Sequence, residues 1–259
     1  MTSDLASYGQ LFLTLLTGLC AGFIDSIAGG GGLITVPFFT LFFGPGPHAI
    51  GTNKMSATVG ATMALAVYFR KGHMDAKRSW IFAFWVGLGS LLGSRTAPLV
   101  PLQAFKWFLV VSCPLILWIV WNKDLWVDQE LKAHTHPNRK WHFLGEPKVI
   151  LSGLLCGFYD GIWGPGGGTF MFLSLLFFAK LPLFAAIAAS KLANSCSALV
   201  AVISYASGGY VHFAEGAAMA CGVGVGAFCG AQFATKRATR VIRPVLAIVA
   251  GLLVLKLFY

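Results

Sequence analysis

A glycine-rich stretch that contains one aspartate interrupts the apolar sequence of this chain twice. The first copy, GFIDSIAGGGG, covers residues 22–32, and the second, GFYDGIWGPGGG, covers residues 157–168. A carboxylate within a lipid-spanning segment is costly, so Asp25 and Asp160 should face protein or a water-filled cavity. Any fold of this chain must therefore bring both breaks inside a bundle. We interpret them as the two halves of one site.

The composition indicates a membrane protein. Of the 259 residues, 57% are hydrophobic and 11% are charged, with a mean hydropathy of +0.75, whereas about a quarter of the residues in a soluble domain are charged. The formal net charge of +10 does not indicate nucleic-acid binding, because the basic residues lie in short loops between apolar segments. The six cysteines all lie in apolar segments without a CxxC pair, so no disulfide framework is expected.

The apolar segments predict an all-α polytopic membrane protein. In the first half we expect five helical segments, at residues 8–28, 33–43, 53–69, 79–97 and 103–122. The second of these has about 11 residues, too few for a span of about 20. Because it follows the glycine break, we expect a short, re-entrant type of helix there, beside four long helices.

The second half repeats this plan. A shift of 135 residues aligns the two aspartates, and after a two-residue insertion a shift of 137 aligns Lys54 with Lys191. The predicted domains are a first transmembrane repeat (1–122), a cytoplasmic polar linker (123–148) and a second transmembrane repeat (149–259). The shift of 137 also aligns Tyr68 with Tyr205, which end their segments and are expected in the aromatic belt. It also aligns three glycines expected to pack helices together, Gly87, Gly89 and Gly93, with Gly224, Gly226 and Gly230.

Loop charges predict how the repeats are oriented. If each repeat has five crossing elements, 14 of the 19 Lys and Arg lie on one side and 3 on the other, with Lys54 and Lys191 in the membrane. Four crossings per repeat give 10 against 7. The positive-inside rule favours the first arrangement, in which the repeats are inverted, the linker is cytoplasmic and both termini are periplasmic. Inverted repeats with matching glycine breaks are typical of secondary transporters.

Lys54 and Lys191 are the second pair of charges at apolar positions, and each is expected to open the third segment of its repeat. A lysine at a helix end can instead reach the membrane interface. Two cations near amide and hydroxyl donors suit a small oxyanion, and glycine breaks add backbone N–H groups that favour anions. The remaining candidate substrate-binding residues are Asn53, Ser190, Asn194, Gly30, Gly31, Gly32, Gly166, Gly167 and Gly168.

Asp25 and Asp160 have two interpretations, which can coexist. As structural groups they would form ion pairs with the two lysines. As functional groups they would take up protons, since low dielectric favours the neutral carboxyl. Neither a catalytic constellation nor a metal or cofactor site is expected, because the chain has no HExxH sequence, and the pair His134 and His136 has no partner at ligand spacing.

These motifs resemble the sulfite exporter TauE/SafE family, also called the four-toluene sulfonate uptake permeases, and in particular its bacterial branch of membrane transporter proteins. The resemblance rests on residues 22–33, the sequence Thr-Asn-Lys at 52–54 and residues 157–161, and it extends over nearly the whole chain. It implies an inner-membrane protein that moves sulfite, sulfonates or sulfoacetate. Two departures, Pro165 in place of Gly30 and Ser190 in place of Asn53, make the expected site only pseudo-symmetric.

The expected function is secondary transport of small sulfur-containing anions across the bacterial inner membrane, with proton coupling and alternating access at the repeat interface. The alternatives are a transporter of another small solute or metal ion, or a membrane assembly factor that transports nothing. The expected partners are a small anionic substrate and the lipid bilayer; nucleic acid is not expected, and a homodimer is left open.

Overall fold

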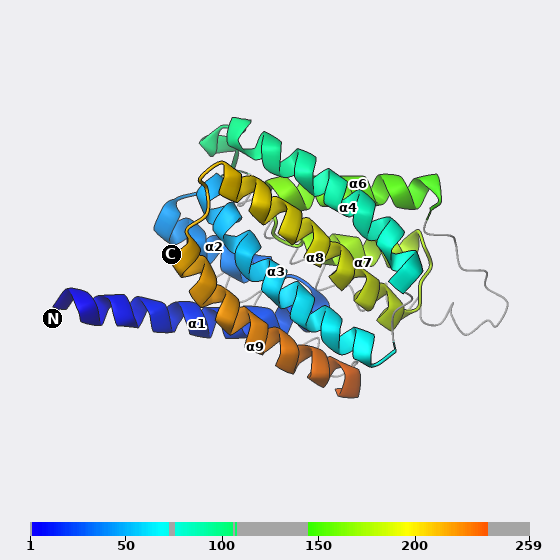
Figure 1. The fold of residues 1–259 in the computed structure, drawn as a ribbon, viewed down its shortest axis with the longest axis horizontal. Helices are drawn as coiled ribbons and strands as arrows, with labels where there is room; N and C mark the ends of the chain where they lie inside the picture. The colour runs from blue at the N-terminus through cyan, green and yellow to red at the C-terminus, as the bar shows by residue number, and fades with distance from the viewer. Residues whose placement is uncertain (1, 73–75, 106, 108–144, 238–259) are drawn as a thin grey trace.

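The computed structural model describes residues 2–72, 76–105, 107 and 145–237, and within these ranges the chain forms helices joined by short turns, without strands (Figure 1). The first half contains α1 (Thr2–Ala28), α2 (Gly32–Phe43), α3 (Pro47–Arg70), α4 (Ala76–Thr96) and a 3₁₀ turn, η1 (Ala97–Leu99). The second half contains α6 (Pro147–Ile162), α7 (Gly167–Phe177), α8 (Leu183–Ser207) and α9 (Phe213–Arg237). Most of the predicted segment 103–122, most of the linker 123–148 and residues 238–259 of the second repeat lie outside the described residues.

The predicted helical segments of the first half are confirmed for the part of the chain that the structure describes, but two of them begin well before the predicted start. Helix α1 begins at Thr2 rather than at residue 8. Helix α3 begins at Pro47, six residues before the predicted start. Proline is favoured at the first helical position because its φ is preset and its missing N–H is not needed there. Lys54 therefore does not open its helix; it lies about two turns inside it, and Lys191 lies equally deep in α8, which begins at Leu183.

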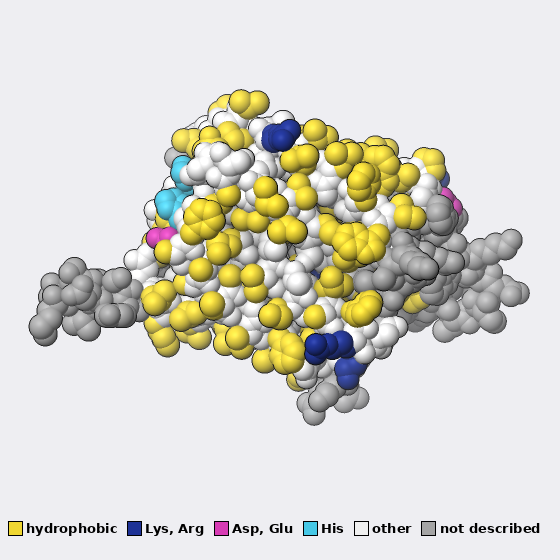
Figure 2. All heavy atoms as spheres, in the orientation of Figure 1, with side chains coloured by type: hydrophobic (Ala, Val, Ile, Leu, Met, Phe, Trp, Pro, Cys, Tyr) yellow, Lys and Arg dark blue, Asp and Glu magenta, His cyan; other side chains and the backbone are white. Residues whose placement is uncertain are grey.

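The helices are long and apolar enough for a membrane protein. Three of them meet the length and hydropathy expected of a span, over Gly9–Ile27, Leu183–Ser207 and Phe213–Thr235, whereas α2 and α7 are shorter apolar helices. Figure 2 shows a face that is largely hydrophobic, with the charged and histidine side chains gathered toward its edges. This distribution suits a protein whose middle faces lipid.

Glycines bring the helices of the two halves into backbone contact. A Cβ added at Gly22 of α1 would collide with the backbone of Val223 in α9, and one added at Gly157 of α6 would collide with the backbone of Val86 in α4. Small residues permit such close approach in membranes. The packing role predicted for the aligned glycines holds for Gly89, Gly93, Gly226 and Gly230, where an added Cβ would meet the backbone of a neighbouring helix; at Gly87 and Gly224 it would meet only side chains.

Helices at matching places in the two halves run in opposite directions. In Figure 1, α3 runs from upper left to lower right and α8 runs beside it the other way; α4 and α9 are likewise opposed. Helices α1 and α6 enter from opposite sides of the view and both end near the middle. The two glycine breaks that follow them therefore lie in the interior of the bundle.

The two aligned tyrosines are buried, so their predicted place in an aromatic belt is wrong. Tyr68 and Tyr205 are 0% and 1% exposed. The hydroxyl of Tyr68 donates to the carbonyl oxygen of Ser26 at 2.9 Å, and that of Tyr205 donates to the carbonyl oxygen of Gly161 at 2.7 Å. A buried tyrosine hydroxyl usually finds such a partner. Each tyrosine thus joins a long helix to the glycine break of its own half.

Candidate functional site

Both glycine breaks end one helix and begin another through backbone that favours glycine. Gly29 and Gly30 follow α1 with φ of +78° and +97°, and Gly166 precedes α7 with φ of +75°, a region that costs a residue with a Cβ about 1–2 kcal/mol. The breaks also contact one another, because a Cβ added at Gly32 would lie 3.3 Å from Cα of Pro165. The two interrupted stretches of the sequence therefore meet inside the bundle.

Two helix N-termini converge where the breaks meet. Helix α2 begins at Gly32 and α7 begins at Gly167, and the glycines around both starts line one cavity. The first N–H groups of a helix have no acceptor within it, and they carry the positive end of the helix dipole. One such group already has an anionic partner, because Gly31 N–H donates to Asp25 Oδ1 at 3.0 Å.

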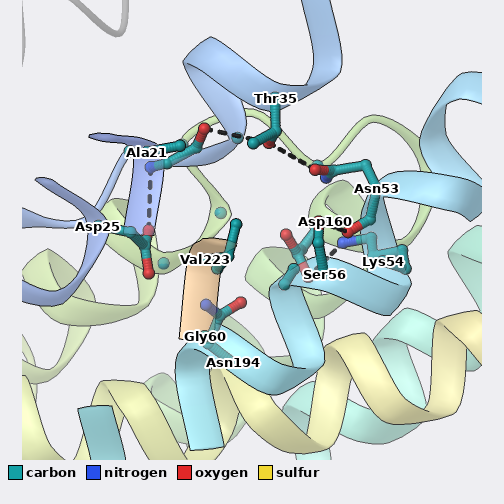
Figure 3. Close-up of a pocket in the computed structure, with 18 residues that line it drawn as sticks. Ala21, Asp25, Thr35, Asn53, Lys54, Ser56, Gly60, Asp160, Asn194 and Val223 are labelled. Carbon is teal, nitrogen blue, oxygen red and sulfur yellow. Dashed lines mark hydrogen bonds and ion pairs between the residues drawn. The ribbon is translucent and has the colours of Figure 1, made fainter. Parts of the chain in front are cut away.

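The first buried ion pair joins α3 to α6. Lys54 Nζ lies 2.7 Å from Asp160 Oδ2, and the two side chains are 2% and 3% exposed (Figure 3). The hydroxyl of Ser197 donates to the same carboxylate oxygen at 2.5 Å. Because Lys54 is buried, the alternative that it reaches the membrane interface is wrong.

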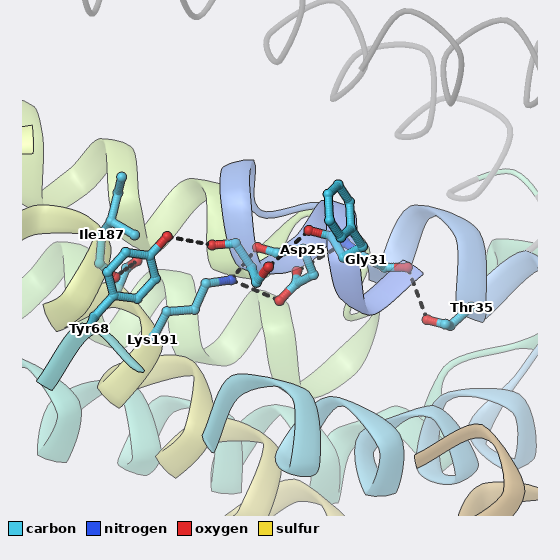
Figure 4. Close-up of polar contacts among 9 residues, drawn as sticks. Asp25, Gly31, Thr35, Tyr68, Ile187 and Lys191 are labelled. Atoms are coloured by element: carbon cyan, nitrogen blue, oxygen red, sulfur yellow. Dashed lines mark hydrogen bonds and ion pairs between the residues drawn. The ribbon is translucent and has the colours of Figure 1, made fainter. Parts of the chain in front are cut away.

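The second buried ion pair joins α8 to α1. Lys191 Nζ lies 2.8 Å from Asp25 Oδ2 and also donates to the backbone carbonyl of Asp25 (Figure 4). The exposed fractions of these side chains are 3% for the lysine and 17% for the aspartate. Both pairs cross between the halves of the chain, so each lysine neutralises the aspartate of the other half.

The cavity between the breaks has a volume of about 40 Å³. Since one water needs ~10–15 Å³ in this measure, it has room for roughly three waters or one compact ion. Most of the predicted site residues line it, namely Asp25, Gly30, Gly31, Gly32, Asn53, Lys54, Asp160, Gly166, Gly167, Gly168 and Asn194. The structure therefore brings eleven of the thirteen predicted residues together.

Two predicted residues, Lys191 and Ser190, do not line the cavity. Lys191 is held by Asp25, as described above, and Ser190 Oγ donates to the carbonyl oxygen of Ile187 in its own helix at 2.8 Å. The cavity is lined by five residues of α3 but only by Asn194 of α8. In this conformation α3, from the first half of the chain, therefore contributes more of the cavity lining than its counterpart α8 in the second half.

The sequence did not predict several small or uncharged residues of the cavity. These are Ala21, Thr35, Ser56, Ala57, Gly60, Gly164 and Val223. Thr35 is the most informative, because its hydroxyl donates to Asn53 Oδ1 at 2.5 Å. Its place one turn after Gly31, on a helix that begins at a glycine break, is the sequence signal that could have identified it.

The described residues contain no group of three or more His, Cys, Asp or Glu side chains that could hold a metal ion. The pair His134 and His136 lies outside the described residues. The two aspartates of the cavity already have lysine partners, and a lysine ammonium beside each carboxylate disfavours a bound cation.

Comparison with known proteins gives a consistent set of relatives. The family model described as sulfite exporter TauE/SafE matches residues 14–257. A "Probable membrane transporter protein ORF9" of a Sinorhizobium species is 34% identical over 98% of this chain and 94% of its own length. A "Probable membrane transporter protein" of Haemophilus influenzae is 32% identical over 96% and 94%, and YfcA of Escherichia coli K12, described in the same words, is 29% identical over 97% and 89%. No solved structure matches the chain.

Proposed function

The chain belongs to the sulfite exporter TauE/SafE family of membrane transporters, and we propose that it carries small sulfur-containing anions such as sulfite, sulfonates or sulfoacetate across the bacterial inner membrane by secondary transport. The family and the names of its relatives agree with the expectation of a transporter rather than an enzyme. The choice of substrate rests on the family name and on the chemistry of the cavity.

The observation that carries the proposal is the meeting of α2, α7 and Lys54 at one small cavity. The N-terminal glycines of α2 and α7 line it together with the Lys54 side chain, so two positive helix ends and one ammonium group face the same space. Helix N-termini are established anion sites. A cavity of about 40 Å³ suits a compact oxyanion.

The charge balance of the site supports proton coupling. An oxyanion at the cavity competes with Asp160 for Lys54, because both need the same ammonium group. A carboxylate that loses its cation in a poorly hydrated interior becomes a proton acceptor. We propose that anion binding and proton uptake by Asp160 are linked in this way. In the opposite conformation of the transporter, Asp25 and Lys191 take the places of Asp160 and Lys54.

The orientation proposed here is that of inverted repeats, 1–122 and 149–259, with a cytoplasmic linker and periplasmic termini. It is supported by the opposed directions of the matching helices (Figure 1) and by the placement of basic residues. One end of the bundle carries four basic residues: Arg70 and Lys71 at the end of α3, Lys148 at the start of α6 and Lys180 before α8. Arg95, near the end of α4, lies near the other end. The positive-inside rule makes the first end cytoplasmic.

Flux measurements on the purified protein in liposomes test the proposal. We expect uptake of sulfite, sulfoacetate or a small sulfonate above that of protein-free liposomes, and a change in rate when a proton gradient is imposed. Asp160→Asn should keep anion flux but lose its dependence on the proton gradient. Transport of divalent metal ions without any anion flux would overturn the proposal, and so would the absence of all flux from well-folded protein.

A further inference from the structure

Thr35 in α2 and Asn53 in α3 form a buried polar contact at the edge of the cavity. Each residue is 3% exposed, and the Thr35 hydroxyl lies 2.5 Å from Asn53 Oδ1. The carbonyl oxygen of Gly31 is a second, more distant acceptor for the same hydroxyl, at 3.1 Å. Figure 3 shows this contact, with Thr35 and Asn53 facing each other from their two helices.

This contact determines which atoms of Asn53 face the cavity. While Thr35 holds Oδ1, the Nδ2 group of Asn53 faces the side of Gly164 where another residue would carry its side chain. A Cβ built at Gly164 would lie 3.8 Å from Asn53 Nδ2 and 3.6 Å from Lys54 Nζ. The amide nitrogen and the ammonium nitrogen therefore border the same part of the cavity. An amide held in this way turns its two N–H donors toward a ligand in the cavity.

Among the residues of the second half that the structure describes, the matching positions form no equivalent contact. The shift of 135 residues that pairs the starts of α2 and α7 places Phe170 at the position of Thr35. The shift of 137 residues that aligns the two lysines places Ser190 at the position of Asn53. The ring of Phe170 packs against Tyr159, at a centroid distance of 5.1 Å, and Ser190 bonds within its own helix. The Thr35–Asn53 pair is thus specific to the first half.

We propose that Thr35 is a positioning residue, which holds Asn53 so that its amide donates to the transported anion beside the Lys54 ammonium. This inference rests on the proposed function. It also identifies α2 as more than a helix that supplies an N-terminus, because its second turn orients a ligand-binding side chain on α3. Asn53 and Lys54 then present hydrogen-bond donors to the same part of the cavity, and the site selects a ligand that accepts hydrogen bonds from them.

Kinetics of sulfite flux in proteoliposomes test this role. Thr35→Val keeps the shape of the side chain and removes the hydroxyl, so Asn53 is free to turn its oxygen to the cavity. Loss of one correctly oriented hydrogen bond should raise KM about fivefold, with the maximal rate and the thermal unfolding temperature close to those of the wild type. Thr35→Ser retains the hydroxyl and should restore the wild-type KM.

Two further variants separate positioning from a general effect on α2. Thr40 lies on the same helix and its hydroxyl bonds only to the carbonyl oxygen of Val36 among the contacts described, so Thr40→Val should leave KM unchanged. The double variant Thr35→Val/Asn53→Ala should have the same KM as Asn53→Ala, because Thr35 acts through Asn53.

The outcomes distinguish this inference from the proposed function. If the wild type transports sulfite and Thr35→Val keeps the wild-type KM, or if its effect adds fully to that of Asn53→Ala, the inference is wrong and the transport proposal stands. If the wild type neither transports sulfite, sulfoacetate or a small sulfonate nor gains thermal stability in the presence of any of them, both are wrong.

Discussion

Each lysine in the interior is paired with an aspartate from the other half of the chain, and the two pairs differ in burial. The Lys54–Asp160 pair is almost completely buried, whereas the Asp25 side chain of the other pair is 17% exposed. Removing one partner of a fully buried pair leaves a charge without hydration or a counter-ion. The two pairs should therefore respond differently to the same substitution.

We predict that Lys54→Gln lowers the thermal unfolding temperature in detergent more than Lys191→Gln does. Loss of one partner of a buried pair costs about 3–5 kcal/mol in protein interiors, and water can reach Asp25 more readily than Asp160. The double variant Lys54→Gln/Asp160→Asn leaves neither member of this pair charged, so it should recover much of the loss. Equal unfolding temperatures for the wild type and both single variants would contradict this account.

The aspartates and lysines could be identified from the sequence, but their pairing could not. Four charges at apolar positions must find partners in the interior, so the alternative of internal ion pairs followed from their positions in the sequence. Which lysine meets which aspartate depends on how the halves pack, and no local pattern records that. Ala57 was missed for the same reason, because it carries no charge and reaches the cavity only through the register of α3. Thr35 was missed because it carries no charge, and its place one turn after Gly31 was the signal that could have identified it.

At the level of the helices, glycine positions determine how closely the two halves can pack. In α4, a Cβ added at Gly89 would collide with the backbone of Leu154 in α6, whereas one added at Gly87 would meet only Val200 Cγ2, at 3.9 Å. The sequence predicted a packing face from the spacing of Gly87, Gly89 and Gly93, but spacing does not tell which glycine touches backbone. The structure makes that distinction.

We predict that Gly89→Ala separates α4 from α6 and lowers both the unfolding temperature and the yield of folded protein. Gly87→Ala, two residues away, is the matched control. It should be neutral or stabilising, because alanine is favoured over glycine in a helix interior by about 1 kcal/mol. Size-exclusion profiles and thermal unfolding in detergent measure both effects; similar behaviour of the two variants would argue against close contact at Gly89.

The start of α3 illustrates the limit of segment prediction. Residues 47–52 include a proline and polar or small residues, so hydropathy placed the helix start at 53, whereas the structure has it at Pro47. This difference moves Asn53 and Lys54 from a helix end into the bundle interior. The helix is held there by cross-half contacts, such as that between the backbone N–H of His212 and Thr52 Oγ1 at 3.0 Å.

At the level of the whole molecule, the ends of the helices should lie on defined sides of the membrane. Lys71 follows α3 at one end of the bundle, and Ser207 ends α8 at the other; both are exposed. The inverted arrangement that we propose puts Lys71 in the cytoplasm and Ser207 in the periplasm.

We predict that a cysteine at Ser207 reacts with a membrane-impermeant maleimide in intact spheroplasts, whereas a cysteine at Lys71 reacts only after the membrane is opened. Both variants are made in a chain whose six native cysteines are replaced. Labelling of the Lys71 cysteine in intact spheroplasts, with the Ser207 cysteine protected, would reverse the orientation. Labelling of both from outside would contradict any model in which α3 and α8 each cross the membrane.

The central claim is that anions pass through the cavity where the two glycine breaks meet, and filling that cavity tests it most directly. Ala57 lines the cavity, whereas Ala66, on the same helix, is exposed on the bundle surface. Leucine at position 57 adds three carbons to a space of about 40 Å³, while leucine at 66 adds them to the lipid-facing side. In proteoliposomes, Ala57→Leu should abolish sulfite flux with the protein still folded, and Ala66→Leu should retain it; wild-type flux through Ala57→Leu would contradict the account.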